Sequence, residues 1–112
     1  MAIKEKLNIT IFGASGSIGE HILNKFYSEE HNLLLFIKDK KKLNLLKKKY
    51  KPKKSQIVNF EQLDVTNTHD LKKKIFKKRT FFKKKNIIIN ASGTQGEIGN
   101  FFDLDLYLNI PT

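Results

Sequence analysis

The chain has no cysteine and no tryptophan, and it has only one arginine and two prolines among its 112 residues. Without cysteine, disulfides and thiolate metal sites are excluded, and the histidines at positions 21, 31 and 69 are too scattered to predict a metal site. No run approaches the roughly 20 apolar residues of a membrane span, and the N-terminus lacks the apolar core and cleavage site of a secretory signal. These absences predict a cytoplasmic protein without a membrane partner.

Positive charge dominates what is present, with a formal net charge of +11. Such an excess suits a nucleic-acid partner, because lysines that neutralise phosphates supply most of the nonspecific affinity. The single arginine, Arg79, argues against that partner, since arginine is the residue that reads bases and grips phosphates with two hydrogen bonds. We therefore interpret the lysine runs as solvated faces and do not expect nucleic acid to bind.

Apolar runs of strand length alternate with segments of helical periodicity. Strands are expected at residues 7–12, 32–37 and 86–90, and a further strand that runs into a turn is expected within residues 55–65. Helices are expected at residues 17–27, from a cap at Asp39 to a stop before Pro52, and from a cap at Thr66 or Asn67 through Phe76. This alternation predicts one α/β domain over residues 1–112, with a parallel sheet and right-handed crossovers.

The last segment, residues 101–109, carries two patterns at once. Apolar and polar residues alternate along FFDLDLYLN, which favours a strand. Phe101, Leu104 and Leu108 also share one face of a helix. The pattern by itself slightly favours the strand.

Glycines 13, 16 and 19 stand between the first expected strand and the first expected helix, in the sequence GASGSIG. The first permits a tight turn, the second lets the backbone approach a pyrophosphate, and the third allows close packing of helix on strand. The free amides and the dipole of the helix then face an anion. The turn predicts a dinucleotide phosphate site, with a plain glycine-rich turn as the alternative.

Two other interpretations of this turn fail on single residues. A P-loop needs lysine and then serine or threonine after its last glycine, whereas Gly19 is followed by Glu20 and His21. A nucleophile elbow at Ser17 needs glycine where Ser15 stands, and only His69 lies far enough downstream to act as a base. Neither a nucleoside triphosphatase nor a serine hydrolase is favoured.

Four motifs together resemble those of the short-chain dehydrogenase/reductase family: GASGSIG at 13–19, LDV at 63–65, NASG at 90–93 and FDLDLYLN at 102–109. The resemblance spans the chain from Leu7 onward and implies a Rossmann-like parallel sheet with flanking helices, truncated to about four strands, that binds NAD or NADP. The residues it implies around the pyrophosphate are Gly13, Ser15, Gly16, Ser17, Ile18 and Gly19. Asp64 and Val65 would lie beside the adenine, and Asn90, Ala91 and Gly93 beside the ribose and the central strand.

Two departures accompany the resemblance. The family's middle glycine usually lies one place later, and its NNAG motif stands here as NASG, with Ser92 in place of alanine. Both changes are small and leave the backbone roles in place. Asn109 matches the asparagine of the family's catalytic tetrad, which the family holds in a helix, so the resemblance favours a helix over residues 101–109.

The form of the cofactor depends on the residues that follow the second strand. NAD binding uses a carboxylate there to accept the ribose hydroxyls, whereas a basic residue suits a 2′-phosphate. Ile37 stands where the acid is expected and Lys38 follows it, so Lys38 favours NADP. Asp39 is the alternative, as the carboxylate that would bind the ribose of NAD, although it equally suits a helix cap.

The family's chemistry implies hydride transfer to a carbonyl or from an alcohol, with a tyrosine as acid and base, assisted by a lysine and a serine. Tyr27 and Tyr107 lack a lysine four places on, and Tyr50 lies at a lysine-rich helix end. We therefore expect the N-terminal, cofactor-binding half of an oxidoreductase, without the catalytic Ser, Tyr and Lys. A noncatalytic dinucleotide-binding or interaction module is the alternative. The fourth strand is expected to have an unpaired edge, through which the chain could associate with a second copy as a homo-oligomer.

Overall fold

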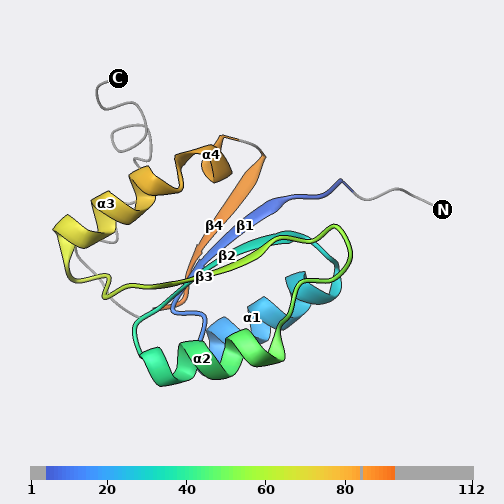
Figure 1. Cartoon of the computed structure of the whole chain (residues 1–112), viewed down its shortest axis with the longest axis horizontal. Helices are drawn as coiled ribbons and strands as arrows, with labels where there is room; N and C mark the ends of the chain where they lie inside the picture. Colours follow the sequence, from blue (N-terminus) through green and yellow to red (C-terminus); the bar gives the residue numbers. More distant parts are fainter. Residues whose placement is uncertain (1–4, 84, 93–112) are drawn as a thin grey trace.

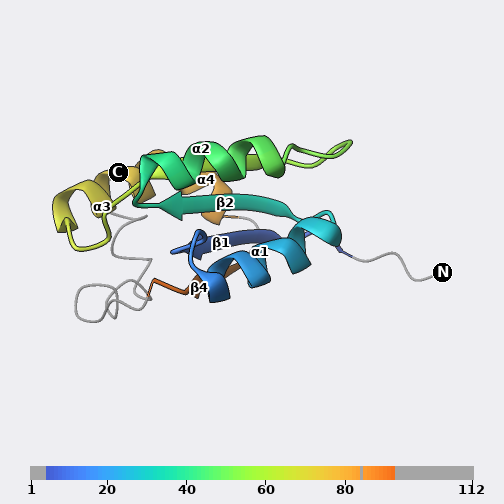
Figure 2. The same ribbon diagram turned by 90° about the horizontal axis from the view of Figure 1, so that it is seen from below.

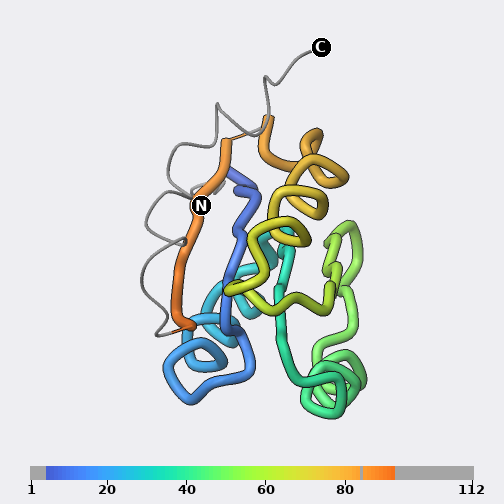
Figure 3. The backbone as a smooth tube through the Cα atoms, turned by 90° about the vertical axis from the view of Figure 1, so that its left-hand side faces the viewer, coloured from blue at the N-terminus to red at the C-terminus, as the bar shows by residue number. Residues whose placement is uncertain are grey.

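The computed structural model describes residues 5–83 and 85–92 and contains one sheet of four parallel strands (Figure 1). The strands are β1 (Asn8–Phe12), β2 (Asn32–Ile37), β3 (Val58–Gln62) and β4 (Asn86–Asn90). Their order is β3-β2-β1-β4, so β1 and β4 are neighbours, visible as the blue and orange tubes in Figure 3. The chain thus has the expected Rossmann-like α/β sheet. The expected features at Gly93, at 101–109 and at Asn109 lie outside the described residues.

Four helices connect and cover the strands: α1 (Ser17–Ser28), α2 (Lys40–Lys49), α3 (Thr68–Lys77) and the single turn α4 (Arg79–Phe82). Figure 1 shows α1 and α2 on one face of the sheet and α3 and α4 on the other. Figure 2, which looks from the side of α1 and α2, shows these two helices in front of the strands. Among the described helices none is long and apolar enough to span a membrane.

The continuous apolar runs of the strands follow from burial on both faces. In β2, Leu33, Leu35 and Ile37 pack against α1 and α2, whereas Leu34 and Phe36 pack on the side of α3. Both sets are fully or almost fully buried. The sheet therefore separates two apolar cores, and a strand with only one apolar face would leave one of them incomplete.

The helix starts agree with the expected caps. The Asp39 carboxylate accepts hydrogen bonds from the backbone N–H of Lys41 (2.8 Å) and Lys42 (3.3 Å) at the start of α2. The Asn67 side chain accepts from the N–H of Asp70 (3.1 Å) at the start of α3. Each cap supplies an acceptor to N–H groups that have no partner within the helix.

Some expectations differ from the structure. The third strand covers Val58–Gln62 and so starts later than the expected segment 55–65, because Ser55 has a positive φ of 66° and a turn joins the Gln56 N–H to the Lys53 carbonyl. Helical spacing groups Ile18 with the buried face of α1, yet Ile18 is 69% exposed, since the first turn of α1 follows directly on the loop at the end of the sheet.

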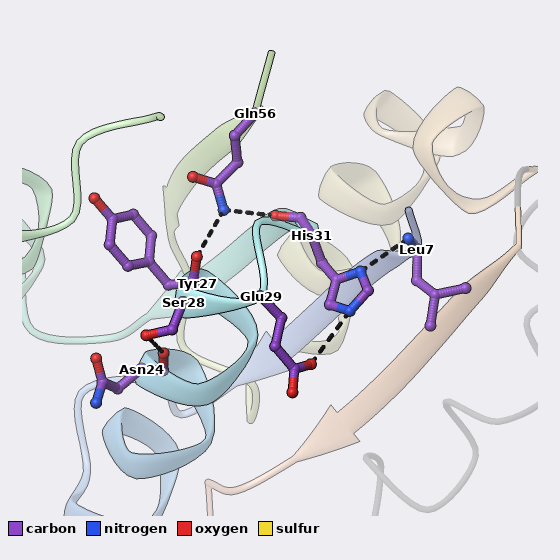
Figure 4. Close-up of polar contacts among 7 residues, drawn as sticks. All are labelled: Leu7, Asn24, Tyr27, Ser28, Glu29, His31 and Gln56. Carbon is purple, nitrogen blue, oxygen red and sulfur yellow. Dashed lines mark hydrogen bonds and ion pairs between the residues drawn. The ribbon is translucent and has the colours of Figure 1, made fainter. Parts of the chain in front are cut away.

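A buried histidine joins the amino ends of β1 and β2 to the end of α1 (Figure 4). The His31 Nδ1 accepts a hydrogen bond from the Leu7 N–H (3.0 Å), and its Nε2 lies 3.3 Å from a Glu29 carboxylate oxygen. Gln56 donates to the His31 carbonyl (2.8 Å). This network lies at the end of the sheet opposite the glycine turn, so it braces the fold and does not belong to the candidate site.

Candidate functional site

The carboxyl ends of the strands surround a hollow of about 240 Å³, which we call the strand-end hollow. In open α/β sheets this edge, where the strand order reverses, is the place where ligands bind. Seven of the predicted cofactor residues line it: Gly13, Ser15, Gly16, Lys38, Asp64, Val65 and Ala91. Phe36, Leu63, Thr66 and Ser92 also line it and were not predicted. Leu63 and Ser92 belong to the LDV and NASG motifs, whereas the only sequence signal of Phe36 and Thr66 is a place at or after the end of a strand.

The other predicted residues that the structure describes are Ser17, Ile18, Gly19 and Asn90, and they do not line the hollow. Ser17, Ile18 and Gly19 form the first turn of α1. Asn90 ends β4, and its side-chain oxygen accepts hydrogen bonds from the Ser92 N–H (3.1 Å) and hydroxyl (2.6 Å). That oxygen therefore braces the turn after β4, and a contact of Asn90 with ribose stays a prediction.

Gly13 and Gly19 are required by the chain's own packing. Gly13 has a φ of +78°, and a Cβ there would lie 2.5 Å from the Cα of Ser92. A Cβ on Gly19 would lie 2.0 Å from the carbonyl oxygen of Gly13. Real side-chain carbons do not approach backbone this closely, so the turn and the contact of α1 with it need glycine at both positions.

Gly16 is different, because nothing in the described chain requires glycine there. Its φ of −72° and ψ of 167° are open to any residue, and a Cβ would meet only the Gly13 carbonyl oxygen, at 3.7 Å. Gly16 is also the N-cap of α1 and supplies no side-chain cap. The first helical hydrogen bond runs from the Glu20 N–H to the Gly16 carbonyl (2.7 Å), so the N–H groups of residues 17–19 have no acceptor within the helix. Open space thus lies beside a set of unused donors and the positive end of a helix dipole, an arrangement that suits an anion.

The end of β2 supplies a lysine to the hollow. Ile37 is fully buried in the core beneath α1 and α2, and Lys38 is the next residue, with a side chain that is 77% exposed. The Lys38 ammonium lies 3.8 Å from the Asp64 carboxylate. Asp39, the alternative acid, is occupied as the cap of α2 and does not line the hollow.

Asp64 is held as an anion at the opposite wall. Its Oδ1 accepts hydrogen bonds from the Thr66 hydroxyl (2.6 Å) and N–H (3.0 Å). These bonds, with a smaller contribution from Lys38, hold the pKa of Asp64 below its ordinary value. The lining of the strand-end hollow therefore carries one negative charge, fixed by hydrogen bonds from Thr66, and one exposed positive charge, Lys38.

The two described tyrosines serve the contact between α1 and α2. Tyr50 is 3% exposed and its hydroxyl donates to Glu20 (3.0 Å), while the Tyr27 hydroxyl donates to the Lys51 carbonyl (2.6 Å). Neither lines the strand-end hollow. Within the described residues, no group of three or more acidic or histidine side chains is placed to hold a metal ion.

Three solved structures with this fold are each much longer than the chain. A short-chain dehydrogenase from Bacillus anthracis is 26% identical, with a TM-score of 0.62 over 73% of this chain and 34% of its own. A short-chain dehydrogenase from Sphingobium yanoikuyae in complex with NADPH is 24% identical (TM-score 0.65, 93% of this chain and 43% of its own). A bulky-bulky ketone specific alcohol dehydrogenase from Comamonas testosteroni is 22% identical (TM-score 0.67, 84% and 38%). The chain thus spans about two fifths or less of the length of these proteins.

Sequence comparison identifies the family. No curated protein sequence matches the chain. Residues 9–107 match the sequence model of the NAD dependent epimerase/dehydratase family, which is nearly the whole chain. Together with the Rossmann-like sheet shared with short-chain dehydrogenases, this match confirms the resemblance in the four motifs, and the chain belongs to the NAD dependent epimerase/dehydratase family.

Proposed function

We propose that the chain forms the adenosine and pyrophosphate half of a nicotinamide dinucleotide site that prefers NADP(H). In its complete form the protein would be an oxidoreductase acting on a small carbonyl or alcohol. The NADPH complex of one structural neighbour and the ketone specificity of another support this choice of cofactor and substrate class. The family match supports the dinucleotide in general.

The observation that carries the proposal is Gly16. Gly13 and Gly19 are explained by packing within the chain, whereas the missing side chain at Gly16 only keeps space open beside the start of α1. A side chain at position 16 would fill the space that a bound anion needs, and it would not destabilise the fold. A diphosphate is the anion that fits a glycine turn between a parallel strand and a helix.

The residues around the strand-end hollow would bind different parts of the dinucleotide. The N–H groups of residues 17–19 and the dipole of α1 would bind the pyrophosphate. Lys38 supplies positive charge at the ribose end, and Val65 and Leu63 give apolar surface beside Asp64 for the adenine. The bound nicotinamide supplies hydride transfer. Asn109 remains the proposed catalytic asparagine.

The test is a fluorescence titration of the 112-residue chain with NADPH and with NADH, comparing the wild type with Gly16→Asp. Aspartate is a preferred N-cap, so Gly16→Asp keeps or slightly raises the unfolding temperature while its carboxylate repels the diphosphate. Gly16→Asn is the matched control of the same shape without the charge. We expect binding by the wild type, weak binding by Gly16→Asn and none by Gly16→Asp. Equal binding by all three, or no binding by a folded wild type, would overturn the proposal.

Cofactor preference is tested at Lys38. Lys38→Gln should weaken NADPH by about threefold and leave NADH unchanged, since one exposed charge near a phosphate contributes roughly 0.2–1 kcal/mol. An equal loss for both cofactors would contradict a role for Lys38 at the ribose.

A further inference from the structure

A second hollow lies at the amino end of the sheet, on the face that α3 and α4 cover (Figure 1). It measures about 380 Å³, and we call it the strand-start hollow. Its lining includes Asn8, Asn32, Asn59, Lys77, Thr80 and Phe81. It shares no lining residue with the strand-end hollow, so an inference about its ligand does not depend on the proposed function.

Two of its three asparagines are explained by the fold. The Asn8 amide donates a hydrogen bond to the Phe81 carbonyl (2.8 Å) and accepts one from the Asn32 amide (3.1 Å). The Asn32 side-chain oxygen in turn accepts from the Ile57 N–H (2.9 Å). These two amides therefore join the starts of β1 and β2 to α4 and to the residue before β3.

The third asparagine, Asn59, has no such explanation. It is paired in the sheet with Leu34, which is fully buried on the side of α3. Because paired residues of neighbouring strands lie on the same face, the Asn59 side chain is on that side too, where an apolar residue would extend the core. Asn59 is half-buried, and across residues 5–83 and 85–92 its amide has no hydrogen-bond partner. A half-buried amide without a partner costs stability, so the fold gives no reason for it.

Two further polar groups of the hollow are also unused. Lys77 is exposed, and in the part of the chain that the structure describes its ammonium forms no ion pair. The adjacent Lys78 lies 3.2 Å from the Glu61 carboxylate, so its charge is balanced. The Thr80 hydroxyl has no hydrogen-bond partner among the described residues. The hollow therefore presents one unbalanced positive charge together with free hydroxyl and amide donors.

These groups indicate the class of ligand. One ammonium with a hydroxyl and an amide as further donors matches the two oxygens of a carboxylate. Ile57, which is 50% exposed, and the half-buried Phe81 add apolar surface to the same lining, and a flat ring packs well against such surface. A phosphate dianion would meet only one unpaired cation here.

We infer that the strand-start hollow binds a small aromatic carboxylate. Lys77, Thr80 and Asn59 bind the carboxylate group, and Ile57 and Phe81 contact the ring. Because the site lies at the opposite end of the strands from the strand-end hollow, the carboxylate and a dinucleotide do not compete.

The first test is an NMR titration of the ¹⁵N-labelled 112-residue chain with benzoate. Benzamide, which has the same shape without the charge, and inorganic phosphate at the same ionic strength are the matched controls. We expect benzoate to shift the side-chain amide of Asn59 and the backbone N–H signals of Thr80 and Phe81, and both controls to bind at least about threefold more weakly. No shift with benzoate, or equal binding of either control, would overturn the inference.

The second test compares Lys77→Gln with Lys73→Gln. Lys73 lies one turn earlier on α3, is exposed and does not line the hollow, so it controls for the loss of one positive charge. We expect Lys77→Gln to weaken benzoate about fivefold and Lys73→Gln to weaken it by less than about twofold. Equal effects of the two substitutions would mean that net charge alone attracts benzoate, and the site would be wrong.

The third test separates binding from structure at Asn59. Asn59→Leu should weaken benzoate about tenfold through the lost hydrogen bond to the carboxylate. It should leave the unfolding temperature unchanged or raise it, because leucine suits a position beside Leu34. A lower unfolding temperature would show that the amide serves the fold and would overturn its role in binding. NADPH affinity should not change in Asn59→Leu or Lys77→Gln, so this inference and the proposed function succeed or fail separately.

Discussion

A methyl group at Gly19 tests how closely α1 approaches the turn that precedes it. The added Cβ of Gly19→Ala would lie 2.0 Å from the Gly13 carbonyl oxygen, 2.9 Å from the carbonyl carbon and 3.0 Å from the Cα of Ala14. All three atoms are backbone, so none can rotate away. Since ordinary contact begins near 3.4 Å, the start of α1 would have to withdraw by about 1.4 Å.

The expected loss of stability follows from two opposing contributions. Overpacking of this kind costs about 1–3 kcal/mol, and the rigid backbone at Gly19 places it at or above the upper end of that range. Alanine restores up to about 1 kcal/mol, because it is the better helix former. We expect Gly19→Ala to lower the free energy of unfolding by about 2 kcal/mol, which lowers the midpoint by roughly 8 °C in a chain of this size.

The assay is thermal unfolding followed by circular dichroism at 222 nm, with Gly16→Ser as the control. The Cβ that Gly16→Ser adds would meet only the Gly13 oxygen, at 3.7 Å, and serine is a preferred N-cap, so the midpoint should stay the same or rise slightly. If Gly19→Ala unfolds within about 2 °C of the wild type, or if both variants fall equally, the close contact of α1 with the turn is not present.

Three further predictions concern stability. Asp39→Ala should lower the free energy of unfolding in urea by about 1 kcal/mol, because the cap of α2 is lost, whereas Asp39→Asn should keep most of the wild-type stability. Equal losses in the two variants would argue against capping. The hydrogen bond from Lys49, helped by Tyr50 and opposed by burial, lowers the pKa of Glu20 from its ordinary value of 4.5. Because the pKa of Glu20 is lower in the folded state than in the unfolded state, this stabilisation is present above pH 4.5 and is lost as the pH falls through the folded-state pKa. Glu20→Gln should therefore make the free energy of unfolding fall less steeply with decreasing pH in the acid range. An unchanged acid dependence would contradict the contribution of the Glu20 ion pair to stability. The fully buried Thr10 hydroxyl has no hydrogen-bond partner among the described residues, so Thr10→Val should raise the free energy of unfolding by about 1 kcal/mol, and a decrease would point to a hidden partner.

Local chemistry explains why much of the fold could be predicted. β2 was predicted with its observed ends because a parallel strand buried on both faces needs an unbroken apolar run. The caps at Asp39 and Asn67 were predictable because a cap binds N–H groups two or three residues ahead in its own chain. The start of the third strand was predicted too early, because Ser55 adopts a left-handed conformation that is uncommon for serine.

The candidate site was only partly predictable, because its residues come from four loops. The turn at 13–19 carries its own signal, and the motifs added Asp64, Val65 and Ala91 through resemblance. Thr66 and Ser92 were missed, although their hydrogen bonds to neighbouring carboxylate and amide oxygens shape the walls.

The sequence by itself determined the alternation of strands and helices, the caps and the position of the glycine turn, because each depends on residues close together along the chain. Tertiary structure decided the strand order, the gathering of residues from four strand ends around one hollow, and the distinct roles of the three glycines. Gly13 and Gly19 are explained only by backbone atoms that folding brings within 3 Å of the place where a Cβ would stand. Gly16 has no such neighbour. A glycine carries no side chain, so its role is set by what surrounds it in space.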